Sequence, residues 1–308
     1  MSRFRFIKDN TSFDFMNVRR IAFFLSSTMM ILSIVLLFTR GLNLGIDFTG
    51  GLLMEIKTPA AVSISAVRES LSSLSAGTPT IQEFGDNSVM IKIPGKEADQ
   101  ETQKTLYEEV KKLLGNDVEY RRVEYVGPQV GKELIMVGVK AFVYSMIGIL
   151  GYLWFRFEWQ FGVTGVMALA HDVCATILFF TLTQFEFDLS TVAAVLLVAG
   201  YSINDTVIVF DRIREMLRKY KKMPLPELLN LSINQTLART IMTSMTTVLV
   251  MLALLIFGAE VIKGFTYAML VGIIVGTYSS IFVAAPMLLY MNLGREPLPF
   301  KSEAELAQ

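Results

Sequence analysis

Two residues of opposite charge stand in apolar segments of this sequence, where they could bind and release a proton. Asp205 lies in "GYSINDTVIVFDRIRE", residues 200–215, and is followed by more apolar residues, whereas Arg239 begins another long apolar run. A charge at the centre of a bilayer costs about 2.5–3.5 kcal/mol, so such groups usually face a bundle interior and pair. Desolvation favours a neutral acid and a nearby arginine favours the carboxylate. This competition predicts a proton pathway with Asp205 as carrier and Arg239 as its partner.

Both residues also have simpler interpretations. Asp205 could belong to a surface helix that runs on into the cytoplasm, although "VIVF" would then lie in water. Arg239 could be an anchor whose charge reaches the lipid headgroups. A polar stripe at helical spacing favours an interior place for the arginine, because polar faces of spanning helices avoid lipid. Its members are Thr236, Arg239, Thr240, Thr243 and Thr247.

Other polar residues of the apolar segments could support this pathway. His171 and Asp172 stand in the middle of one run, and Asn204 precedes Asp205. For Asp172, a structural hydrogen bond between helices is an equally weighted alternative. The predicted supporting set is His171, Asp172, Asn204, Thr243 and Thr247. A second stripe of small residues, Gly272, Gly276 and Ser280, predicts close helix packing within this chain or against a partner.

Composition limits the other kinds of chemistry. Of 308 residues, 53% are hydrophobic and 18% charged, and the 28 basic and 28 acidic residues cancel. This balance gives no sign of nucleic-acid binding. One cysteine and one histidine exclude a multi-cysteine or two-histidine metal site. We therefore expect no metal, no cofactor and no enzymatic activity.

Six apolar runs are long enough to cross a membrane, which needs about 20 residues. They cover residues 20–39, 134–154, 161–183, 189–210, 240–257 and 264–291. Basic residues gather before the first run and in a loop at about 211–238, so both termini are predicted to be cytoplasmic. The predicted boundaries are a cytoplasmic segment 1–19, a first span 20–39, an exterior domain 40–132, further spans within 133–291 and a cytoplasmic tail 292–308.

The exterior domain shows an α+β pattern. Strands are predicted at 51–58, in a hairpin around "DN" and at 118–126, with helices at 60–74 and 99–115. The order βαββαβ is that of a ferredoxin-like domain, which by itself names no function. The predicted fold class is thus a polytopic α-helical membrane protein of six transmembrane helices with one ferredoxin-like domain.

The stretch "LGIDFTGG", residues 44–51, joins the first span to this domain. The predicted junction residues are Gly45, Asp47, Gly50 and Gly51. A tight turn in which glycines allow positive φ is an equally weighted, purely structural interpretation.

Six motifs together resemble the SecD/SecF family of protein-export membrane proteins, and among them the SecF type. They are "LGIDFTGG", "VGPQVGKEL", "FRFEWQFG", "ALAHDV", "YSINDTVIVFDRIRE" and "TLARTIMTSMTT", in the order of the family. The resemblance covers nearly the whole chain. It excludes the first eighteen residues and the tail after 293, which carry no matching motif.

The resemblance implies partners and an activity. A member of this family pairs with SecD, a similar six-span protein, and assists the SecY/SecE/SecG channel, with YajC as a further partner. The pair, related to resistance-nodulation-division transporters, uses the proton-motive force to move preproteins across the bacterial inner membrane to the periplasm. The exterior domain would then be periplasmic. Asp205 and Arg239 take the places of the family's proton-path residues.

Two other functions stay open on the sequence. The chain could be a passive scaffold of the translocon, in which case neutralising Asp205 would be harmless. It could also be half of a proton-driven small-molecule exporter, although such proteins usually carry two large exterior domains.

Overall fold

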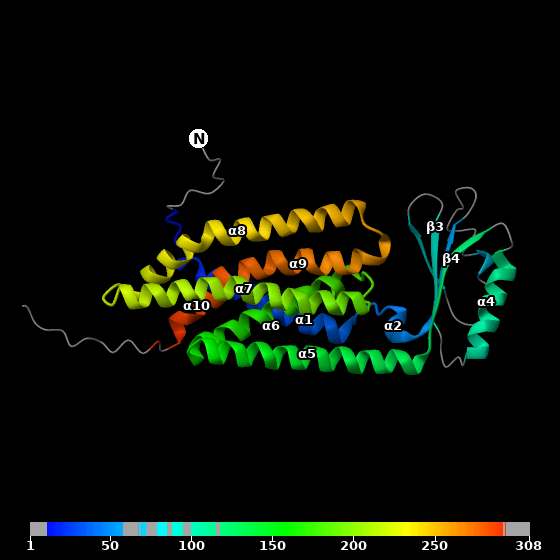
Figure 1. The fold of residues 1–308 in the computed structure, drawn as a ribbon, viewed down its shortest axis with the longest axis horizontal. Helices are drawn as coiled ribbons and strands as arrows, with labels where there is room; N and C mark the ends of the chain where they lie inside the picture. The colour runs from blue at the N-terminus through cyan, green and yellow to red at the C-terminus, as the bar shows by residue number, and fades with distance from the viewer. Residues whose placement is uncertain are drawn as a thin grey trace, which may run out of the picture.

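The computed structural model describes residues 11–57, 67, 69–71, 79–84, 88–94, 100–114, 118–291 and 293. Within these ranges, six helical stretches are long and apolar enough to cross a membrane, and they form one elongated bundle (Figure 1). They are α1 (Arg19–Thr39), α5 (Pro128–Arg156), α6 (Trp159–Thr183), α7 (Leu189–Lys219), α8 (Leu225–Phe257) and a last stretch. That stretch comprises α9 (Lys263–Ser279), the π-helical turn η2 (Ser280–Ala284), α10 (Ala285–Met287) and η3 (Leu288–Tyr290). A short 3-10 turn, η1 (Glu260–Ile262), precedes it.

Two helices extend well beyond the predicted spans. α7 continues past residue 210 to Lys219, and α8 begins at Leu225, so most of the predicted loop 211–238 is helical. The extensions are amphipathic: Ile213 and Met216 pack in one apolar cluster with Leu228. The helices therefore project from the apolar bundle while still burying one face.

The sheet domain lies at one end of the bundle (Figure 1). Its four strands are β1 (Gly51–Lys57), β2 (Thr80–Phe84), β3 (Ser88–Pro94) and β4 (Glu119–Val126). They form an antiparallel sheet in the order β2-β3-β1-β4, and α4 (Gln100–Leu114) covers one face. This is the order of a ferredoxin-like fold, so the predicted fold class is confirmed. Of the helix predicted at 60–74, only 67 and 69–71 are described, and the hairpin turn 85–87 lies outside the described residues.

Both faces of the sheet are buried at its centre. Alternate residues of a strand point to opposite faces. Met54 of β1 and Ile91 of β3 pack beneath α4 with Val110. Leu53 and Met90 point the other way, toward the bundle, where they pack with Ile46. The sheet domain therefore rests on the bundle through its second apolar face.

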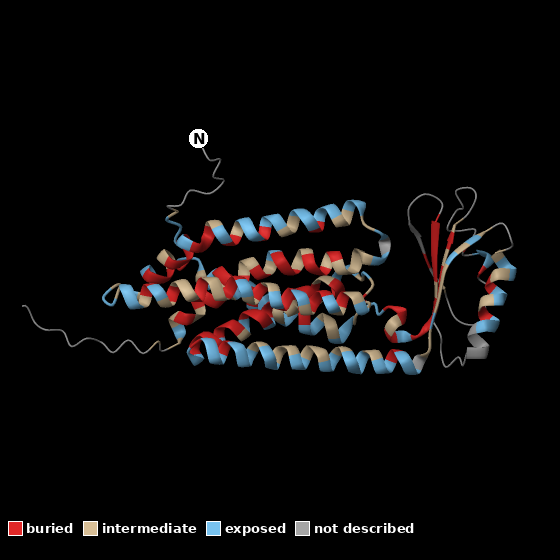
Figure 2. Cartoon of the chain, viewed as in Figure 1, coloured by how far each residue is buried: buried red, intermediate tan, exposed pale blue. Residues whose placement is uncertain are grey.

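Helices α7 and α9 pack closely in the centre of the bundle, where Figure 2 shows most of the buried surface. A Cβ added to Gly272 of α9 would lie 2.2 Å from Cγ2 of Val198, and one on Gly276 would lie 3.0 Å from Cβ of Ser202. Ser280 is also buried and begins the π-helical turn. The small residues at 272 and 276 thus let α9 approach α7.

We predict that Gly272→Ala destabilises the bundle. The new methyl group overlaps a branched side chain on a neighbouring helix, and such overpacking costs about 1–3 kcal/mol. Gly148→Ala in α5 is the matched control, because a Cβ there meets nothing within 4 Å. Thermal unfolding of the purified protein in detergent should show a lower midpoint for Gly272→Ala alone, and equal midpoints would contradict this packing.

Candidate functional site

Asp205 lies inside the bundle with few hydrogen bonds. The carboxylate is 0% exposed on α7, and its Oδ2 accepts one long hydrogen bond, 3.4 Å, from Ser244 Oγ of α8. Oδ1 has no hydrogen-bond partner among the described residues. Ser244 is held in turn by Thr277 of α9 at 2.6 Å. Asp205 therefore lies where α7, α8 and α9 meet. Helix α7 continues beyond it to Lys219, but Asp205 is buried and does not cap a surface helix.

Arg239 makes no direct contact with Asp205 within the described ranges. The arginine is exposed on the surface of α8, and no hydrogen bond or ion pair joins it to Asp205 in the described part of the chain. The predicted stripe is divided: Thr236 and Thr240 are buried, whereas Arg239 and Thr243 face outward. Within this chain, only part of the stripe therefore faces other helices, and that a partner or water meets the exposed part stays a prediction. The buried arc of α8 is rotated toward Ser244, because Thr236, Thr240 and Ser244 follow one another at i, i+4 and i+8.

Asp172 of α6 is saturated with hydrogen bonds. Its Oδ2 accepts from Ser202 Oγ of α7 and, at 2.8 Å, from Ser279 Oγ of α9, and its Oδ1 contacts His171 Nδ1 at 2.9 Å. The His171 ring stacks on Tyr278 with ring centroids 5.9 Å apart. His171 and Asp172 thus act together, although side chains at adjacent helical positions point about 100° apart. This is the structural, interhelical role that the sequence left open for Asp172.

The two acids share one layer of polar residues between α6, α7, α8 and α9, all of them buried except the half-buried Thr277. We call it the polar layer, and it comprises Asp172, Ser202, Asp205, Ser244, Thr277 and Ser279. The sequence analysis missed its four hydroxyl residues. Ser202 stands three residues before Asp205, and Ser244 stands four after Thr240, so helical spacing carried the signal for both.

The remaining predicted residues lie at the edge of this layer. Thr247 of α8 bonds Tyr201 of α7 at 3.2 Å, which gives a further contact between these helices. Asn204 is exposed on α7, as Thr243 is on α8. No three His, Cys, Asp or Glu side chains within the described ranges are grouped as metal ligands would be.

The junction residues lie between the first span and the sheet. Gly45 precedes the short helix α2 (Ile46–Thr49). Gly50, which follows α2, and Gly51, the first residue of β1, adopt φ of 72° and 138°. Positive φ favours glycine, in agreement with the tight-turn interpretation. Asp47 Oδ2 accepts a hydrogen bond of 2.9 Å from Leu189 N, at the start of α7.

These features define a class of protein: a multi-pass membrane protein with a polar layer inside its helix bundle and one α+β domain outside it. The family model "Protein export membrane protein SecD/SecF, C-terminal" matches residues 106–294, and the "SecD/SecF GG Motif" matches residues 35–58. The chain therefore belongs to the SecD/SecF family, as its motifs predicted.

Relatives of known name agree with this assignment. Protein translocase subunit SecF of Rickettsia rickettsii is 42% identical over 92% of this chain and 93% of its own. Protein translocase subunit SecF of Cereibacter sphaeroides is 43% identical over 95% of this chain and 94% of its own length. The chain is thus a subunit of the Sec protein translocase.

Solved structures of SecDF match the fold. SecDF of Thermus thermophilus, described as a translocon-associated membrane protein, has a TM-score of 0.82 and 36% identity over 92% of this chain. A super-membrane-facing form of SecDF gives a TM-score of 0.69 at 36% identity. In both cases this chain spans 39% of the length of the solved protein.

We predict that Asp172→Ala destabilises the bundle by about 1 kcal/mol. Hydrogen bonds between membrane helices contribute about 0.6 kcal/mol each on average, and two are lost, those from Ser202 and Ser279. Thr176→Ala is the control, because its buried hydroxyl bonds a carbonyl of its own helix, that of Asp172, at 3.0 Å. Unfolding in mixed detergent micelles measures the free energy. Equal losses in both variants, or full additivity of Asp172→Ala with Ser279→Ala, would contradict the network.

Proposed function

We propose that this chain pairs with SecD and uses the proton-motive force to promote preprotein translocation across the inner membrane, with Asp205 as the proton carrier. The observation that carries this proposal is the contrast between the two buried acids. Asp172 receives three polar contacts, whereas Asp205 receives one long hydrogen bond and leaves Oδ1 without a partner. The carboxylate of Asp172 is held by neighbouring side chains, whereas that of Asp205 keeps one oxygen available to a proton.

Magnitudes support this division. An ionised carboxylate inside a membrane protein costs about 2.5–3.5 kcal/mol, and one hydrogen bond between membrane helices returns about 0.6 kcal/mol. Protonation of Asp205 removes the rest of this free-energy cost of a buried charge. When the proton leaves, the positive charge of Arg239 lowers the cost of the ionised carboxylate. One proton crossing a potential of 100 mV releases about 2.3 kcal/mol. The driving force is thus of the size needed to change the charge state of Asp205.

The outer surface of the bundle supports a partner in the same membrane. Arg239 and Thr243 of α8 and Asn204 of α7 are exposed at the depth of apolar spans. The outer sides of α5 and α8 are mostly exposed (Figure 2). In the most apolar stretch of α8, only 17% of the residues are buried within this chain. Lipid is a poor neighbour for a guanidinium group. We propose that SecD covers this face.

Orientation belongs to the same proposal. The projecting end of α7 carries Arg212, Arg214, Arg218 and Lys219. Basic residues mark the cytoplasmic side. Both termini would then be cytoplasmic and the sheet domain periplasmic. We also propose contact with the SecY/SecE/SecG channel and YajC, which the resemblance to the family supports.

We predict that Asp205→Asn abolishes the stage of export that depends on the proton-motive force. Asparagine keeps the shape and can accept from Ser244, but it cannot carry a proton. Inverted vesicles with SecD, the variant and a stalled preprotein are depleted of ATP, and translocation driven by an imposed proton gradient is measured. Asp211→Asn is the control, because this acid of α7 pairs with Arg156 at 2.7 Å outside the polar layer. Wild-type export by Asp205→Asn would favour the passive scaffold.

We predict that the polar face of α7 and α8 is covered by SecD. A cysteine at Thr246, which is exposed on α8, is labelled with a photoreactive benzophenone in a Cys174→Ala background. It should form a cross-link to SecD. The same label at Phe24 of α1, 71% exposed on a helix that packs against α6, should form none. Equal yields from both positions would contradict the assignment of this face.

A further inference from the structure

The helix that carries Asp205 begins with two carboxylates from different parts of the chain. The first N–H groups of an α-helix have no partner within the helix and are commonly bonded by side chains. Asp188, which directly precedes α7, accepts from Thr191 N at 2.7 Å and from Thr191 Oγ1 at 2.6 Å. Asp47 accepts from Leu189 N at 2.9 Å and comes from α2, at the start of the sheet domain. The helix end thus has a local cap and a second, distant one.

Asp47 belongs to a rigid connection with the sheet. α2 leads within two glycines into β1, and a Cβ on Gly131 of α5 would lie 2.7 Å from the carbonyl oxygen of Phe48. Backbone hydrogen bonds join the start of α2 to the segment before α7: Gly45 N donates to Phe187 O at 2.9 Å, and Phe187 N donates to Asn43 O at 2.8 Å. On its other side α2 contacts the sheet, because Ile46 packs with Leu53 of β1 and Met90 of β3, so a shift of the sheet is transmitted to α2 and Asp47.

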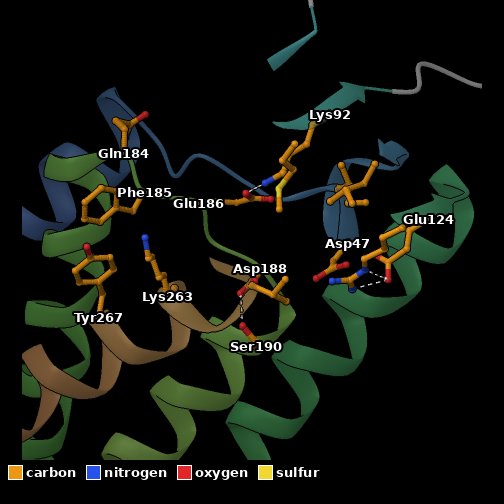
Figure 3. Close-up of a pocket in the computed structure, with 16 residues that line it drawn as sticks. Asp47, Lys92, Glu124, Gln184, Phe185, Glu186, Asp188, Ser190, Lys263 and Tyr267 are labelled. Atoms are coloured by element: carbon orange, nitrogen blue, oxygen red, sulfur yellow. Dashed lines mark hydrogen bonds and ion pairs between the residues drawn. The ribbon is translucent and has the colours of Figure 1, made fainter. Parts of the chain in front are cut away.

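Packing between the sheet domain and the start of α7 is interrupted by a cavity of about 660 Å³ (Figure 3). Asp47, Asp188 and Ser190 line it on one side, and Lys92 and Glu186 meet across it in an ion pair. Polar contacts cross this space beside the apolar contact of Ile46 with Leu53 and Met90. Among the polar contacts in the described part of the chain, the bond from Asp47 is the one that the sheet-domain side makes to the backbone of α7 itself.

We propose that Asp47 is a positioning residue that couples the sheet domain to the helix carrying Asp205. This inference rests on the proposed function and adds that a change at Asp205 moves the sheet domain. Leu189 and Asp205 are 16 positions apart on one continuous helix, about 24 Å at 1.5 Å per residue. A displacement of α7 at the polar layer therefore reaches Asp47 through the hydrogen bond from Leu189 N. The Asp47 carboxylate also attracts the positive, N-terminal end of the α7 dipole.

The test compares Asp47→Ala with Asp47→Asn in the vesicle assay described for Asp205. We expect Asp47→Ala to lower proton-driven export at least fivefold. Asp47→Asn should stay within twofold of wild type, because its amide oxygen can still accept from Leu189 N. Asp188→Ala is the control: it removes the local cap of the same helix, so it should lower the unfolding midpoint and leave proton-driven export within twofold of wild type.

A second readout separates coupling from damage to the proton site. Dicyclohexylcarbodiimide labels buried protonated carboxyl groups, and we expect the labelling of Asp205 to be unchanged in Asp47→Ala. Covalent linkage should restore export: Leu44 and Phe187 form a backbone bridge, and adjacent strands lie about 4.8 Å apart, within the reach of a disulfide. Oxidised Leu44→Cys/Phe187→Cys in the Asp47→Ala, Cys174→Ala background is the rescue variant.

Four results would overturn the coupling role: full export by Asp47→Ala, equal loss in Asp47→Asn, loss of Asp205 labelling, or no rescue by the disulfide. Each of these leaves the proposed function standing if Asp205→Asn abolishes proton-driven export. If Asp205→Asn exports normally, the proposed function fails independently of Asp47.

Discussion

The interior of a membrane bundle offers no bulk water, so a carboxylate there depends on hydrogen bonds from neighbouring helices. Asp172 has polar contacts with its own helix, with α7 and with α9, and it joins the three helices around one side chain. The close approach at Gly272 and the stacking of Tyr278 on His171 lie beside this centre. Helix α8 is joined to it less firmly, through Ser244 and Thr247. The bundle thus consists of a tightly bonded group of three helices and a more loosely attached fourth.

The same contrast organises the connection to the sheet domain. The sheet uses one apolar face for its own core under α4 and the other, with Leu53 and Met90, for contact near the bundle. Between these contacts lies a cavity crossed by polar groups (Figure 3). A polar connection of this kind has defined partners and direction, whereas apolar packing would allow sliding. It joins the sheet to α7, one of the three tightly bonded helices.

Much of this fold could be predicted from the sequence, because apolar runs of about 20 residues and alternating strands are strong signals. The ends of α7 and α8 were missed because their projecting parts bury only one face and lack continuous apolarity. Asp205 and Asp172 were identified because charge is rare in such runs. The place of Ser244 on the buried arc of α8 was missed, since periodicity puts Arg239 and Ser244 on neighbouring arcs without showing which arc faces the rest of this chain. The bond between Asp47 and Leu189 joins positions 142 residues apart, and neither spacing nor composition carries a signal for it.

The π-helical turn Ser280–Ala284 has a consequence for the register of the last span. Each residue advances an α-helix by about 100°, and a π-helical turn contains one residue more than an α-helical turn. The small residues before the turn face α7, while Ile281, Ala284 and Leu288 join the apolar cluster at the opposite end of the bundle from the sheet domain. The extra residue changes the phase of the helix between its two halves. One span can thereby satisfy two packing surfaces that a regular α-helix would present at mismatched angles.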